Sequence, residues 1–183
     1  MTDSSDAIQS ERLDLQRLQV ADADEMVAVL NDPRLYEFIG GAPPTATALR
    51  ERYLRLSEGR SEDRTEAWRN WIVRIRADGA TIGTVQATIV DSGRRAAIAW
   101  VIGMPWQGRG YATEAAAALV DWLIDRGVRS IDAAIHPAHA ASATVARRIG
   151  LEPTDEQVDG ERVWRLAAPN RSADSPTPTD ESR

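Results

Sequence analysis

The stretch WVIGMPWQGRGYATEAAAALVDWL, Trp100 to Leu123, decides the fold prediction. It begins as an apolar β-type run, passes through a loop that contains Gly108 and Gly110, and continues at once as an amphipathic helix. The first N–H groups of a helix lack intrahelical partners and carry a partial positive charge. Glycines directly before that point let an anion approach these amides without meeting a Cβ. We therefore interpret QGRGYA, residues 107–112, as a cradle for a phosphate or pyrophosphate, with the charge of Arg109 nearby.

Three other interpretations compete with a phosphate cradle in this loop. A dinucleotide-binding G-x-G-x-x-G fingerprint fits poorly, because Thr113 stands at the third glycine and GMPWQ separates the strand from Gly108. A P-loop is excluded, since the sequence contains no G-K-[ST]. A plain strand-to-helix turn stays open as the structural alternative.

The composition narrows the class of protein. The chain has 183 residues, 43% hydrophobic and 27% charged, with a formal net charge of −6 and a pI near 5.0. These values are typical of one globular domain and disfavour a nucleic-acid partner. We expect no membrane partner and no secretory signal, and hence a cytoplasmic protein. The sequence has no cysteine, which excludes disulfides and a cysteine nucleophile, and we expect no metal.

The chain is predicted to form one domain between two tails. Residues 1–10 are expected to be a disordered polar tail, and 167–183 a disordered tail rich in Ser, Pro, Thr and Asp. Residues 11–166 are predicted to be a mixed α/β domain whose sheet is mainly antiparallel with one helix crossover near its middle. Strands are expected at 12–18, 71–75, 81–90, 96–102, 130–136 and on both sides of a turn at 159–160; helices at 22–32, 45–60, 111–126 and 140–149; and an irregular loop at 34–44.

Three segments together resemble a known family. QGRGYA matches Q/R-x-x-G-x-G/A, the pyrophosphate-binding motif of the GNAT superfamily of acetyl-CoA-dependent N-acyltransferases. GRGYATEA, HPAHAASATVARRIGLEP (136–153) and the opening over 11–40 resemble the ribosomal-protein N-terminal acetyltransferase (RimJ/RimL-like) branch. The resemblance covers nearly all of residues 11–166. It implies a sheet with helices on both faces and a splayed central strand pair.

The resemblance also implies acetyl-CoA as cosubstrate and assigns residues to it. The backbone of one central strand would bind the pantetheine, and an N–H at Val101 or Ile102 would polarise the acetyl carbonyl. His139 replaces an asparagine that contacts pantetheine and caps the next helix, and histidine is a poorer cap. The implied cofactor-binding residues are Trp100, Val101, Ile102, Gln107, Gly108, Arg109, Gly110, Tyr111, Ala112, His139 and Ser142.

The catalytic residues match the family pattern less completely than the cofactor-binding residues do. Ala146 stands where many relatives carry a tyrosine that acts as the general acid. Ser142 is therefore the implied proton donor to sulfur. The alternative is that Ser142 is an ordinary first-turn serine that bonds the backbone. Ala97 stands where relatives of this branch often carry a glutamate. Glu37, His136 or solvent is then left to take the proton of the amine.

The acceptor side is expected around the loop LYEFIGG (35–41) and the turn at 159–161. Tyr36 and Phe38 would wall the substrate channel, unless both are core residues, and Glu37 would attract a cationic substrate. The predicted function is direct acetyl transfer in a ternary complex to a primary amine, either a protein N-terminus or a small molecule. A non-catalytic coenzyme A-binding sensor or scaffold is the alternative, and the chain is expected to be a monomer or a homodimer.

Overall fold

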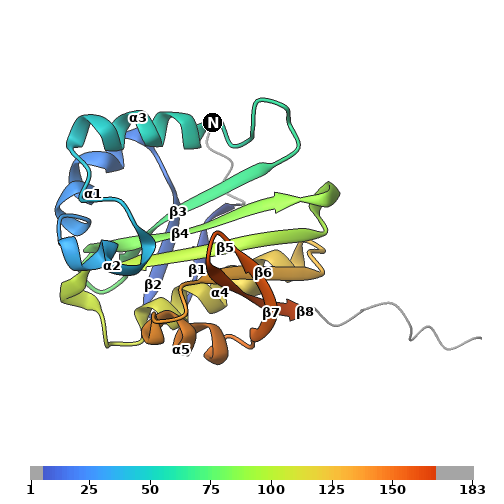
Figure 1. Cartoon of the computed structure of the whole chain (residues 1–183). Helices are drawn as coiled ribbons and strands as arrows, with labels where there is room; N and C mark the ends of the chain where they lie inside the picture. The colour runs from blue at the N-terminus through green and yellow to red at the C-terminus, as the bar shows by residue number, and fades with distance from the viewer. Residues whose placement is uncertain (1–5, 168–183) are drawn as a thin grey trace, which may run out of the picture.

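Period-two alternation of apolar side chains places the central strands in one sheet, seen in the computed structural model, which describes residues 6–167 (Figure 1). Within these residues the sheet has eight strands in the order β1-β2-β3-β4-β5-β6-β8-β7, and β5 and β6 are its parallel pair. The other neighbours are antiparallel, so the predicted mixed α/β class is confirmed. The strands are β1 Ile8–Gln9, β2 Leu13–Arg17, β3 Ala67–Ile75, β4 Thr81–Val90, β5 Arg95–Ile102, β6 Ser130–Ile135, β7 Glu152–Val158 and β8 Glu161–Ala167.

Helices cover both faces of the sheet, as predicted (Figure 1). On β3, Trp71 and Val73 face the core that contains the buried residues of α4, while Ile72 faces the second core, with α1 and α3. This strand is apolar on both sides because both of its faces are buried. The helices are α1 Ala23–Val29, α2 Tyr36–Ile39, α3 Ala46–Ser57, α4 Tyr111–Asp125 and α5 Ala140–Arg148. None of the helices in residues 6–167 combines the length and hydropathy needed to span a bilayer.

The N-terminal boundary differs from the prediction. Strand β1 pairs with β2 in the register Ile8 with Leu15, and the side chain of Ile8 is buried. The Trp71 indole N–H donates to the Asp6 carbonyl at 2.6 Å, which fixes the chain just before β1. The predicted disordered tail over 1–10 is therefore wrong from Asp6 onward. Residues 1–5, and the predicted tail from 168 to 183, lie outside the described residues.

The predicted irregular loop at 34–44 contains helical structure. Pro33–Leu35 form a 3-10 turn that leads directly into α2. The Asp32 carboxylate accepts the Arg34 N–H at 3.0 Å, and the fixed φ of Pro33 suits the first helical position. Gly40, at φ 73°, ends α2 after one turn. These local signals are strong enough to order the segment beside the candidate site.

The two parallel strands separate soon after they pair. Their register has three steps, Arg95 with Ser130, Ala96 with Ile131 and Ala97 with Asp132. Beyond these three steps, β5 continues to Ile102 and β6 to Ile135, but the two strands no longer pair with each other. This splay leaves a wedge in the sheet between the two strands, as the family resemblance implied.

Candidate active site

The register of β5 determines which of its backbone groups face the wedge. The Gly103 N–H donates to the Ile82 carbonyl at 2.8 Å, so alternate residues from Gly103 backward bond to β4. Val101, opposite Thr84, belongs to this set. Trp100 and Ile102 belong to the other set, whose N–H and C=O groups point toward β6; the Ile102 carbonyl accepts a hydrogen bond from Gln107 Nε2 at 2.9 Å. Of the three strand residues predicted to bind a cofactor, two therefore present backbone groups to the wedge, and Val101 does not.

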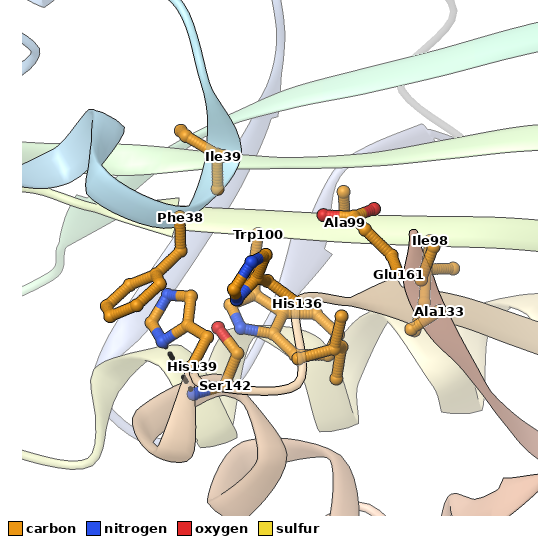
Figure 2. A pocket seen from close by; sticks show the side chains of 12 residues that line it. Phe38, Ile39, Ile98, Ala99, Trp100, Ala133, His136, His139, Ser142 and Glu161 are labelled. Atoms are coloured by element: carbon orange, nitrogen blue, oxygen red, sulfur yellow. Dashed lines mark hydrogen bonds between the residues drawn. The ribbon is translucent and has the colours of Figure 1, made fainter. Parts of the chain in front are cut away.

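A cavity of about 380 Å³, including its open mouth, occupies the wedge. Both strands line it, and so do α2, the start of α5 and the start of β8 (Figure 2). It reaches side chains on both faces of β5, since Trp100 and Ala99 point to opposite faces. The lining residues are Phe38, Ile39, Ile98, Ala99, Trp100, Ala133, Ala134, Ile135, His136, His139, Ser142 and Glu161.

The glycine loop ends at an open helix start. Gly108 and Gly110 adopt φ 74° and 82°, which a residue with a Cβ adopts only at a cost. Gly110 is the N-cap of α4 and supplies no side-chain cap. The first backbone hydrogen bond of the helix runs from the Glu114 N–H to the Gly110 carbonyl at 3.0 Å. The amides of residues 111–113 therefore precede the first intrahelical hydrogen bond. This is the arrangement that binds an oxyanion at a helix N-terminus.

An ion pair between exposed Arg12 and half-buried Glu114, which was not predicted from the sequence, supports this loop. The Glu114 carboxylate accepts from the Arg12 backbone N–H, the Arg12 Nε and the Ser10 hydroxyl, each at 2.7 Å. Arg12 in turn donates to the Arg109 carbonyl at 3.1 Å and lies 4.6 Å over the Tyr111 ring. Burial pushes the pKa of Glu114 upward, but the hydrogen bonds from Ser10 and Arg12 outweigh it and lower that pKa. We call Arg12 and Glu114 the loop clamp.

Ser142 lies in the first turn of α5 and lines the cavity, with its hydroxyl oxygen turned toward the Trp100 side in Figure 2. Its backbone N–H donates to His139 Nδ1 at 3.5 Å, so His139 does cap α5, through a long hydrogen bond. A cap of this kind requires an unprotonated Nδ1. Burial, and then the nearby His136, lower the pKa of His139, while Glu37 opposes the shift. The environment thus favours the neutral imidazole that the cap needs.

The predicted acceptor residues separate into two groups. Phe38 lines the cavity and stacks on His139 with ring centroids 4.7 Å apart; His136 lies 5.5 Å from the same ring. The Tyr36 hydroxyl donates to the Leu30 carbonyl at 3.0 Å, and burial raises its pKa; the residue does not line the cavity. Glu37 is exposed and also lies outside the lining. The carboxylate that does line the cavity belongs to Glu161, which the sequence indicated only as part of a turn.

The sequence of this chain also shows which protein family it belongs to. The sequence model of the Acetyltransferase (GNAT) domain matches residues 12–152. The chain belongs to this acetyltransferase family. As a GNAT protein it is an acyltransferase, which confirms the predicted enzyme class. Among curated proteins no sequence match is found. Within residues 6–167, no group of three or more His, Asp or Glu side chains is arranged to hold a metal ion.

Solved structures share the fold. A RimL ribosomal-protein alpha-N-acetyltransferase in complex with coenzyme A superposes with a TM-score of 0.75 and 16% identity, covering 88% of this chain and 98% of that one. An acetyltransferase from Agrobacterium tumefaciens gives 0.70 and 25% over 91% and 96% of the two chains. The aminoglycoside acetyltransferase AAC(6')-Ib in complex with coenzyme A gives 0.69 and 20% over 85% and 94%. This GNAT domain is thus similar to enzymes with quite different acceptors.

Proposed function

We propose that this GNAT protein is an acetyl-CoA-dependent N-acetyltransferase of the RimJ/RimL-like branch, acting on a primary amine. The observation that carries the proposal is the wedge between β5 and β6, whose cavity adjoins Ser142 and whose β5 strand is followed, after one 3-10 turn, by the Gly108–Gly110 cradle. The similar RimL and AAC(6')-Ib structures both contain coenzyme A, which supports acetyl-CoA as the cosubstrate. We place the enzyme in the cytoplasm, in keeping with its composition.

The described residues fit this cosubstrate. The amides at the start of α4 suit its pyrophosphate, and the backbone groups of Trp100 and the N–H of Ile102, which face the wedge, suit the amides of pantetheine. When bound, acetyl-CoA supplies a thioester whose carbonyl carbon accepts the amine. An N–H of β5 aimed at the carbonyl oxygen can stabilise the developing charge by about 3 kcal/mol.

Ser142 is the proposed proton donor to the departing sulfur. It lines the cavity beside Trp100, and the His139 cap holds the first turn of α5 that carries it. A direct transfer of this kind needs no covalent acyl-enzyme and so needs no cysteine. The proton of the amine leaves on the opposite side of the reaction centre, to solvent or to a group on the acceptor face.

The test is a thiol-release assay with acetyl-CoA over a panel of free amines and N-terminal peptides, paired with calorimetry of acetyl-CoA. Binding with turnover on one class of amine supports the proposal and names the acceptor class. Ser142→Ala should lower kcat by about 100-fold, the lower range for a general acid, with acetyl-CoA affinity retained. An unchanged kcat would remove Ser142 from the mechanism. Binding without turnover on any amine would favour a coenzyme A sensor.

A further inference from the structure

The acceptor face of the wedge has a floor of small residues. Ala97 pairs with Asp132 in the parallel register, so Ala97 and Ala99 of β5 share a face with Ala134 of β6. All three alanines are exposed. On the other face of the same strands, Ile98 and Ala133 are buried in the core with α4. The small side chains of the alanine face therefore leave room for an acceptor at the wedge, whereas Ile98 and Ala133 of the opposite face pack against the core that contains α4.

One carboxylate lies at the edge of this floor. Val163 pairs with Ala134, so Glu161, two residues earlier on β8, lies on the same face. Glu161 lines the cavity, and in Figure 2 its carboxylate is drawn over Ala99. It is the acidic side chain of the cavity lining, and it is half-buried.

The neighbouring charges do not neutralise Glu161. The nearest arginine of the same strand face, Arg165, is bound to Asp132 at 2.7 Å and to Glu156 at 2.8 Å. Arg95 also pairs with Asp132, at 3.4 Å. Among the described residues 6–167, no ion pair or side-chain hydrogen bond involves the Glu161 carboxylate. A half-buried carboxylate without a protein cation is available to a ligand ammonium.

Apolar side chains flank the same opening. Ile39 of α2 lines the cavity and is 49% exposed. Val158 is 53% exposed and pairs directly with Glu161 across the β7–β8 turn, so the two side chains share a face. One exposed aliphatic side chain in the cavity lining and another beside Glu161 on the β7–β8 hairpin indicate a ligand whose charge lies next to an apolar group.

We propose that Glu161 binds the ammonium of the acceptor, and that the acceptor carries a compact apolar group beside its amine, in contact with Ile39 and Val158. This rests on the proposed acetyltransferase function. Two kinds of acceptor carry an ammonium next to an apolar group: a peptide N-terminus whose first side chain is apolar, or a free alkyl- or arylamine. Glu37, which the sequence favoured for attracting the substrate, lies outside the cavity lining, so Glu161 takes over that role.

Glu161→Gln keeps the size of the side chain and removes its charge. We expect KM for a cationic amine to rise about tenfold, the effect of an interaction worth about 1.4 kcal/mol. The Kd of acetyl-CoA, measured by calorimetry, should stay unchanged. Glu152→Gln, an exposed glutamate on β7, is the matched control and should leave every parameter unchanged.

The outcomes separate this inference from the proposed function. If the wild-type protein fails to bind acetyl-CoA, the proposed function falls and the role of Glu161 falls with it. If it binds and turns over but Glu161→Gln leaves KM for cationic amines unchanged, the role of Glu161 alone is overturned. Peptides and free amines matched in their apolar group distinguish the two sources. If the enzyme prefers a polar polycation to both of these acceptors, the proposed apolar group of the acceptor is overturned.

Discussion

The loop clamp gives the sharpest energetic prediction, through the substitution Glu114→Gln. Its carboxylate is 16% exposed and accepts three hydrogen bonds of 2.7 Å from Ser10 and Arg12. A glutamine of the same shape loses the charge and turns one NH₂ group toward these donors. Hydrogen bonds to charged groups contribute about 1.5–3 kcal/mol. We therefore expect a loss of about 2–3 kcal/mol in the free energy of unfolding.

For a chain of this length, 1 kcal/mol shifts the melting temperature by about 2–4 °C, so Glu114→Gln should lower it by roughly 4–12 °C. Arg12 would also release the Arg109 carbonyl, so the cradle would have to be ordered on binding, and the Kd of acetyl-CoA should rise about fivefold. Thermal melts and calorimetry measure the two effects. Asp121→Asn, an exposed acid on the same helix, is the control. Unchanged stability and affinity in Glu114→Gln would refute the clamp.

Three further predictions follow from particular contacts. Gly83→Ala would place its Cβ 2.1 Å from the Val101 carbonyl oxygen, so β5 must shift; thermal melts should show a loss of about 1–3 kcal/mol, and an unchanged melt would contradict this register. His139 has a lowered pKa in the fold, so the unfolded chain binds more protons just below the ordinary value of 6.5, and stability should fall as pH decreases from there. Urea titrations at several pH values measure that slope, and His139→Asn should flatten it. Phe38→Ala exposes His139 to water and should also reduce the slope, whereas an undiminished slope would assign the titration elsewhere.

Local signals made much of the fold predictable, including the glycine loop that leads into α4. The alternation in the strands and the glycines before α4 depend on nearby residues, and both carry over directly into the structure. The direction in which the backbone groups of Val101 point could not be predicted from the sequence, because it depends on how β4 pairs with β5. The splay of β5 and β6 came from the family resemblance rather than from periodicity.

Contacts between distant segments were the part that the sequence did not reveal. Arg12 and Glu114 are far apart in the chain and meet only because β2 passes beside the start of α4. Glu37 and Glu161 are equally acidic in the sequence, but the single turn of α2 directs Glu37 outward while β8 brings Glu161 to the wedge. A sequence signal did exist for the clamp, since a first-turn glutamate before an apolar helix face requires a partner once it is buried.

The central claim is that the amides at the start of α4 hold the pyrophosphate of acetyl-CoA. Calorimetry of acetyl-CoA with the wild-type protein and with Gly110→Asp tests it most directly. Gly93→Asp is the matched control, because Gly93 has a similar φ of 88° and lies in the β4–β5 turn, at the end of β5 away from the cradle. We predict binding by the wild type and by Gly93→Asp, and no measurable binding by Gly110→Asp. Wild-type affinity in Gly110→Asp, or no binding by the wild type, would contradict the account.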